Sequence, residues 1–249
     1  MHNTLALFIT FLLGFFIIIG VIIAFFLKKQ KKVLDFIFAF ALSILTMLIL
    51  TDLLGHTIEH LGIKHIYLFI LFTCLGLLIF KIIDDFVPEH EDVKMTKKEE
   101  KKNIVHIGVL ATIALIIHNF VEGMAIYLTA INDINLGIMM ALGVGLHNIP
   151  LGIIVTTTLN NDEKLGKYLF CIISLFISSF VGGLLLYLLN INAVSDIVIG
   201  SLLALTIGML LYIIIFELYP KVKKTSNKKI TIIGLGCGVI IAIFAMLIG

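Results

Sequence analysis

Eight long apolar runs limit the folds that this sequence can adopt. A helix needs about 20 apolar residues to cross the hydrocarbon core of a bilayer, and runs of that size occur at 5–27, 33–54, 66–83, 104–130, 135–159, 168–190, 195–218 and 230–248. Of the 249 residues, 60% are hydrophobic and 14% are charged. A soluble domain of this length could not cover so much apolar surface. The sequence therefore predicts an all-α, polytopic membrane bundle of eight transmembrane helices that forms a single domain over 1–249.

The lysines are divided unevenly between the loops. All 18 basic residues are lysine, and 17 of them follow the first, third, fifth or seventh run or end the third, which leaves only Lys64 in the other set of loops. Cytoplasmic loops of membrane proteins carry the excess of positive charge. We therefore expect both termini to be extracellular, in a multi-pass protein of the plasma membrane. The longest loop, 84–103, has charges of mixed sign and is expected to be a flexible cytoplasmic segment between the third and fourth helices.

Two stretches within the fourth and fifth runs repeat a polar pattern. HNFVEGMAI begins at His118 and HNIPLGIIV begins at His147, and each histidine is near the middle of its run. Because consecutive spans are antiparallel, the two histidines should lie at similar depth. Glu122 follows His118 by four residues, which places both side chains on one helix face. An ionised carboxylate at the bilayer centre costs about 2.5–3.5 kcal/mol even on the lenient insertion scale, so Glu122 must be protonated, paired or bound to a cation.

These residue types match a metal site. Two imidazoles and a carboxylate are ligands that borderline divalent metals favour, and asparagine can add amide oxygens without adding charge. We expect a metal site made of His118, Asn119, Glu122, His147 and Asn148. The alternative is that these side chains only hydrogen bond across helices and hold the bundle together. A functional site is favoured because ionisable residues inside a membrane are functional by default.

Further ionisable residues lie at the outer end of the second run. Asp52, His56, Glu59 and His60 have the spacing i, i+4, i+7 and i+8, so they form one stripe if the helix continues past Gly55. Such a stripe would mark the way into the membrane for a cation. A solvated helix end explains it equally well.

The inner ends of two other runs also carry carboxylates. Glu217 ends the seventh run, and Asp84 and Asp85 end the third. We expect Glu217 to lie on the way out of the membrane. Snorkelling of these three side chains to the interface is the alternative.

With these motifs, the chain resembles the ZIP (Zrt-, Irt-like protein) family of divalent metal transporters. The resemblance rests on HNFVEG and HNIPLG in consecutive spans, on TDLLGH at 51–56 and on GMLLYIIIFELYP at 208–220. It extends over essentially the whole chain, and His118, Asn119, Glu122, His147 and Asn148 fall on family metal ligands. It implies transport of zinc, with iron, manganese and cadmium as alternatives, into the cytoplasm, and often a homodimer.

What the resemblance implies about cofactors and partners is equally specific. The resemblance implies that Zn²⁺ is the transported substrate and not a resident cofactor, and that the protein is not an enzyme. Its partners are metal ions and the lipid bilayer, with no nucleic acid among them.

The sequence departs from the family pattern at two places. Many members have a second carboxylate at the position of Leu151, and some have another in the sixth span, where this chain has Ser178 and Ser179 and no ionisable group. Both carboxylates would serve a second, neighbouring ion. Their joint absence predicts a site for one ion.

Two other functions are compatible with the same residues. A transport-deficient relative that only senses metal would also keep the ligands. A membrane-embedded metallohydrolase would need a general base beside the metal, but no HExxH motif is present and no serine or aspartate lies within a turn of either histidine. The hydrolase is therefore the weakest of the three hypotheses.

Overall fold

The protein is a bundle of long helices with an apolar outer surface. The computed structural model describes residues 2–26, 31–86, 97–159, 165–225 and 227–248, and these residues form helices and short connections with no strand. Seven helical segments in these ranges are long and apolar enough to cross a membrane, and α10 (Lys228–Ile248) is a further apolar helix of 21 residues. The predicted all-α membrane bundle is thus confirmed, whereas the extracellular position of the termini stays a prediction.

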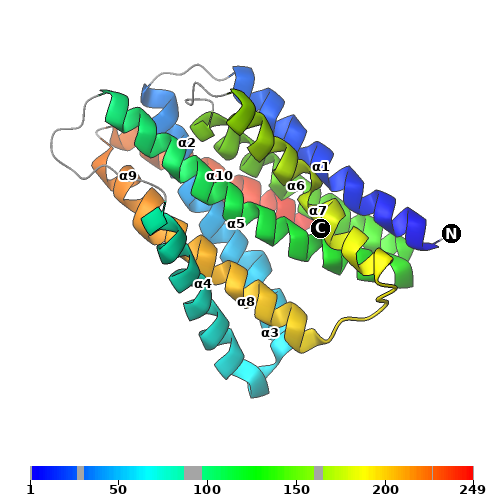
Figure 1. Ribbon diagram of the computed structural model, residues 1–249. Coiled ribbons are helices and arrows are strands. Elements are labelled where there is room, and N and C mark those ends of the chain that lie inside the picture. Colours follow the sequence, from blue (N-terminus) through cyan, green and yellow to red (C-terminus); the bar gives the residue numbers. More distant parts are fainter. Residues whose placement is uncertain (1, 27–30, 87–96, 160–164, 226, 249) are drawn as a thin grey trace.

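The helices divide into two groups, each packed mainly on itself (Figure 1). The first group contains α1 (His2–Phe26), α5 (Lys97–Asn132), α6 (Ile134–Leu159) and α7 (Leu165–Leu188). The second contains α2 (Lys31–Leu48), α3 (Leu54–Leu61), α4 (Ile66–Phe86), α8 (Asp196–Tyr212), α9 (Tyr219–Lys224) and α10. Contacts between the groups are fewer and run chiefly from α5 to α8 and from α6 to α2 and α10.

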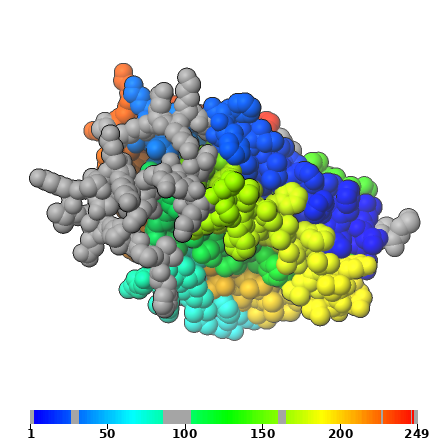
Figure 2. Space-filling model, turned by 45° about the horizontal axis from the view of Figure 1, so that its top comes forward, coloured from blue at the N-terminus to red at the C-terminus, as the bar shows by residue number. Residues whose placement is uncertain are grey.

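Large apolar side chains cover the outside of the bundle. Figure 2 shows α7 lying against α1 on one face, and Phe15, Phe170 and Ile173 are exposed on these two helices. Exposed apolar patches of this extent are unusual on a soluble monomer. They are the surface expected for contact with lipid tails.

Two spans are extended by π-helical turns. α2 continues through the π-helix η1 (Ile49–Leu53) into α3, and α8 continues through the π-helix η3 (Ile213–Leu218) into α9. The condition that the second helix runs past Gly55 is therefore met. A short 3₁₀ turn, η2 (Ile63–His65), then leads to α4. Single π-helical turns within helices are rare and occur often at functional sites.

The loop predicted at 84–103 is shorter than expected at both ends. α4 continues to Phe86 and α5 already begins at Lys97, while 87–96 lie outside the described residues. The early start of α5 has a physical reason, because Lys97–Lys102 is rich in lysine and glutamate, which are good helix formers. Figure 1 shows this end of α5 near the inner ends of α2 and α9 at the upper left.

The closest helix pairs meet at glycines. Reciprocal pairs occur between α1 and α6, between α5 and α7 and between α4 and α8: Gly20 with Gly152, Gly123 with Gly182, and Gly76 with Gly208. In each pair, a Cβ added to either glycine would overlap a backbone carbonyl of the other helix. Small residues allow such close approach in membranes, where packing rather than water exclusion holds helices together. All three pairs join helices of the same group, so each group is tightly packed within itself.

We expect Gly20→Ala to destabilise the first group. The new Cβ would overlap the carbonyl of Ile149, and overpacking of this kind costs about 1–3 kcal/mol. The midpoint of thermal unfolding in detergent should fall by several degrees. Gly236→Ala is the control, because nothing lies near the added methyl on α10. An equal midpoint for the two variants would contradict the close crossing of α1 and α6.

Candidate functional site

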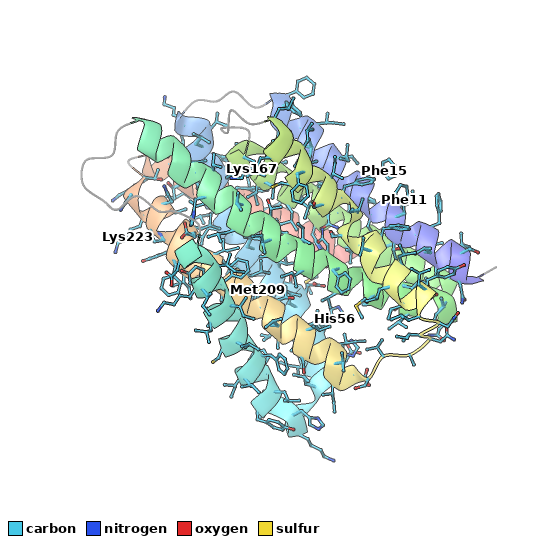
Figure 3. The ribbon with its side chains drawn as sticks, viewed as in Figure 1. Phe11, Phe15, His56, Lys167, Met209 and Lys223 are labelled. Atoms are coloured by element: carbon cyan, nitrogen blue, oxygen red, sulfur yellow. The ribbon has the colours of Figure 1, made fainter. Side chains whose placement is uncertain are left out.

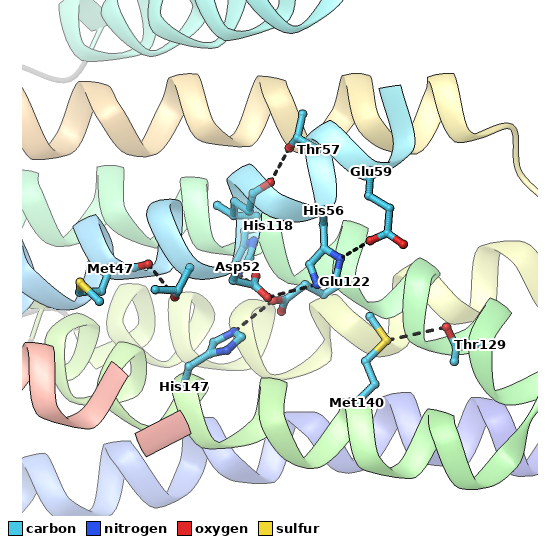
Figure 4. Close-up of polar contacts among 12 residues, drawn as sticks. Met47, Asp52, His56, Thr57, Glu59, His118, Glu122, Thr129, Met140 and His147 are labelled. Carbon is cyan, nitrogen blue, oxygen red and sulfur yellow. Dashed lines mark hydrogen bonds and ion pairs between the residues drawn. The ribbon is translucent and has the colours of Figure 1, made fainter. Parts of the chain in front are cut away.

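Three ionisable side chains meet within the first helix group. His118 and Glu122 come from α5 and His147 from α6, and one ligand atom of each lies within 4.8 Å of the other two. The Nε2 atoms of both histidines lie 3.0 Å from the same Glu122 oxygen, Oε1. All three side chains are almost fully removed from the surface. Figure 4 shows the two imidazoles approaching the carboxylate from different helices.

The turn between α5 and α6 explains why the histidines meet. The Asp133 carboxylate accepts hydrogen bonds from the backbone N–H groups of Asn135 and Leu136, at 2.9 and 3.1 Å, and so caps the start of α6. His118 and His147 are nearly equidistant from this turn along the chain. Two antiparallel helices joined there bring both side chains to the same depth, as expected from the sequence.

The asparagines after each histidine are buried without hydrogen-bond partners. Asn119 and Asn148 are fully buried, and within the described residues neither their amide nitrogen nor their oxygen has a partner, nor does Oε2 of Glu122. Buried polar atoms are normally paired, and each one left unpaired costs about 1–3 kcal/mol. Unpaired donors and acceptors beside a buried carboxylate suit a site that receives a polar ligand. The role of the two asparagines as ligands stays a prediction.

The region where a second ion would need carboxylates is neutral. Leu151 is buried in α6, one turn after His147. On α7, the Ser178 hydroxyl donates to the carbonyl of Leu175 at 2.7 Å, and the Oγ of buried Ser179 has no partner in the described part of the chain. Among the residues that the structure describes, Glu122 is therefore the one acidic side chain in the cluster with the two histidines.

A cavity of about 780 Å³ is lined by His147 of the trio and by residues at the predicted outer ends of the second and seventh spans. Its lining includes His147 and Leu151, which are mostly or fully buried, and the more exposed Asp52, His56 and Glu59, which we call its mouth. His56 lies between two carboxylates, 3.6 Å from Asp52 and 3.5 Å from Glu59, and Figure 3 shows its position on α3. The outer residues predicted to mark the way in therefore line one cavity.

His60 lines the same cavity and also contacts a second helix. Its Nδ1 lies 2.9 Å from the carboxylate of Asp196, the first residue of α8. His56, Glu59 and His60 all lie in α3, and Asp52 of η1 stays within reach of His56 at the i,i+4 spacing. The four side chains line one cavity, and His60 also joins this part of the chain to α8.

A second cluster of metal-ligating side chains lies near the end of α4 and the first turns of α5, on the side predicted to face the cytoplasm. Asp84, His106 and Glu217 each place one ligand atom within 4.8 Å of the others. His106 Nε2 lies 2.6 Å from one oxygen of Asp84, and the Tyr212 hydroxyl donates to the other oxygen at 2.5 Å. Asp84 and Glu217 thus turn inward, so snorkelling does not account for them. The sequence analysis did not single out His106. Like His118, it is a histidine within an apolar run, and such residues are candidates for a functional site.

Comparison with known proteins identifies the family of this chain. A family model described as ZIP zinc transporter matches residues 88–246, which is more than half of the chain. This chain belongs to the ZIP family. The zinc transporter ZupT of Clostridium perfringens is 30% identical to it over the whole chain and 97% of the relative. The ZupT proteins of Enterobacter sp. and Lysinibacillus sphaericus are 29% and 32% identical, over 85% and 70% of this chain and 83% and 68% of their own lengths.

ZIP membership confirms the resemblance noted in the sequence. It also agrees with the expectation of a membrane transporter and not an enzyme, so the metallohydrolase hypothesis is set aside.

Because the surroundings of Leu151 are neutral, we expect this site to hold one zinc ion per chain. The zinc bound to purified protein should fall by one ion per chain in Glu122→Ala, measured by equilibrium dialysis and elemental analysis. Glu59→Ala removes an exposed carboxylate at the cavity mouth and should leave the tightly bound zinc unchanged. Leu151→Glu supplies the missing second carboxylate and should add one ion. A loss of two ions in Glu122→Ala would contradict a mononuclear site.

Proposed function

We propose that this protein carries zinc across the membrane into the cytoplasm, one ion at a time, through the site formed by His118, Glu122 and His147. The observation that carries the proposal is the convergence of two imidazoles and one carboxylate from antiparallel spans. The ZIP family model and the ZupT relatives, which are named zinc transporters, support zinc as the substrate. Iron, manganese and cadmium are alternative substrates with similar ligand preferences.

The donor set suits a site that binds and then releases its ion. Imidazole nitrogens and a carboxylate oxygen bind Zn²⁺ well, and Asn119 and Asn148 would complete the shell with neutral oxygens. A single carboxylate neutralises only half of the charge of a divalent cation. The ion therefore keeps a net positive charge in the site, which limits its affinity and favours release. A cage of cysteine thiolates would bind more tightly, and the described part of the chain has no cysteine in this cluster.

The arrangement of cavities supports alternating access. The cavity that contains His147 opens at the end of the bundle with few lysines, whereas the cluster of Asp84, His106 and Tyr212 lies towards the end with many. His106 belongs to α5 of the first group, and Asp84 belongs to α4 of the second. The hydrogen bond between them therefore joins the two groups on the inner side, and we call it the inner latch. Movement of the first group against the second would break the latch and expose the ion to Asp84 and Glu217.

Zinc uptake should depend on the trio. Glu122→Ala and His147→Ala each remove a proposed ligand, and each should reduce zinc uptake into cells or proteoliposomes to the level without the protein. The matched control is His65→Ala, because the His65 Nδ1 bonds the backbone carbonyl of Leu61, at 2.9 Å, and His65 belongs to neither metal-ligating cluster of the described residues. Uptake equal to wild type in both ligand variants would overturn the site. Tight zinc binding without flux in the unaltered protein would instead favour the metal-sensing hypothesis.

Breaking the inner latch should shift the protein away from its outward-open state. A hydrogen bond to a charged group contributes about 1.5–3 kcal/mol, so His106→Leu should change the equilibrium by at least about tenfold. The measurement is the labelling rate of Met140→Cys, in the cavity wall, by a membrane-impermeant thiol reagent in a chain without its three native cysteines. Labelling should slow in His106→Leu and stay unchanged in His65→Leu. Faster or unchanged labelling in His106→Leu would contradict the latch.

The homodimer and the plasma-membrane location remain part of the proposal. Both follow from the family resemblance and the lysine distribution, and the multi-pass membrane character itself is supported by the helices. Size-exclusion chromatography with light scattering would determine the oligomeric state.

A further inference from the structure

A second cavity, of about 560 Å³, lies on the outside of the second helix group and has no role in the proposed zinc path. We call it the outer groove. Its walls come from α2, from η3 with the first residue of α9, and from α10: Leu42, Ser43, Thr46, Met47, Ile214, Ile215, Tyr219, Leu235 and Val239. None of these residues is acidic, and none is a lysine or a histidine.

The polar atoms of the groove lining are already paired. The Ser43 hydroxyl donates to the carbonyl of Phe40 at 3.1 Å, and the Thr46 hydroxyl donates to the carbonyl of Leu42 at 2.6 Å. Both side chains are thus satisfied within their own helix. The groove offers an apolar ligand a surface with no free hydrogen-bonding group on these two side chains.

Glycine packing explains why the groove exists. α10 approaches α2 through Gly234 and Gly238, where an added Cβ would overlap atoms of Phe36 and Ser43. The next residues, Leu235 and Val239, then line the groove beside η3. The glycines thus place α10 against α2, and the groove lies between these two helices and Ile214 and Ile215 of η3.

A basic residue is attached directly to the groove wall. Tyr219 lines the groove and is more than half exposed, and the Lys223 ammonium lies over its ring, 6.0 Å from the centroid. Lys223 is in α9, at the end of the bundle where lysines gather, and Figure 3 shows it far from Lys167 of α7. An apolar groove ending at a lysine near the membrane surface matches a lipid with an apolar chain and an anionic headgroup.

We propose that the outer groove binds one anionic glycerophospholipid, with an acyl chain between α2, η3 and α10 and its phosphate paired with Lys223. The proposal is independent of the zinc site, which lies in the other helix group. Ile214 and Ile215 belong to the same π-helix as Glu217, so the bound chain packs against the segment that carries this inner carboxylate.

Native mass spectrometry of the detergent-purified full chain tests this proposal. Phosphatidylglycerol and phosphatidylcholine with identical acyl chains serve as the anionic and neutral probes. The protein should retain phosphatidylglycerol about fivefold better, because one lysine near an anionic surface contributes on the order of 1 kcal/mol. Lys223→Gln should remove this preference, whereas Lys167→Gln should keep it.

The groove itself is tested by filling it. Val239→Trp should abolish retention of both lipids, and Leu235→Phe, a smaller change, should weaken it, with folding checked by size-exclusion chromatography. Equal retention of the two lipids by wild type, or equal loss of preference in Lys223→Gln and Lys167→Gln, would overturn the headgroup assignment. Wild-type retention in a folded Val239→Trp or Leu235→Phe variant would overturn the groove.

Discussion

The buried carboxylate of Glu122 is the constraint on which the rest of the molecule depends. A charge in the middle of an apolar bundle is unfavourable unless opposite charge or hydrogen-bond donors surround it. The chain meets this requirement with two imidazoles directed at one oxygen. This arrangement needs two helices whose histidines lie at equal depth. The turn capped by Asp133 joins α5 and α6 in that way. The packing of α5 against α6 is therefore linked directly to the chemistry of the site.

The division of the helices into two groups bears on how the site could move relative to the rest of the protein. All three residues of the trio lie in the first group, whose helices are held together by the close approaches at Gly20 and Gly123. The mouth of the cavity and the inner carboxylates lie mainly in the second group. Movement between the groups can change which side of the membrane the trio faces and leave the distances between its ligands unaltered. Glycine contacts that join only helices of the same group favour movement of this kind over distortion of either group.

Much of the fold and the centre of the site could be predicted from the sequence, because both depend on local patterns. Apolar runs about as long as a bilayer is thick indicate the spans, and the spacing of His118 and Glu122 places them on one helix face. The remainder depends on contacts between distant segments. Asp84, His106, Tyr212 and Glu217 come from four separate elements, and no spacing along the chain relates them. The π-helical turns at η1 and η3 also could not be predicted from a periodicity of 3.6 residues, nor could the contact of His60 with Asp196 of α8, 136 residues away.

The number of carboxylates at each position along the proposed path bears on the direction of transport. The trio, which we propose to lie mid-membrane, has one, Glu122, and the cluster on the proposed inner side has two, Asp84 and Glu217, beside a single histidine. A divalent cation that keeps a net positive charge at the trio would be neutralised at the inner cluster. Asp84 is bonded to His106 and Tyr212 while the cavity is open to the outside, so its oxygens become available only when the latch opens. Leu151 contributes to this difference, because a carboxylate at its position would bring the charge of the mid-membrane site level with that of the inner one. Leu151 therefore favours movement of the ion from the trio to the inner cluster. The one-ion site and the inner latch both contribute to this difference in charge.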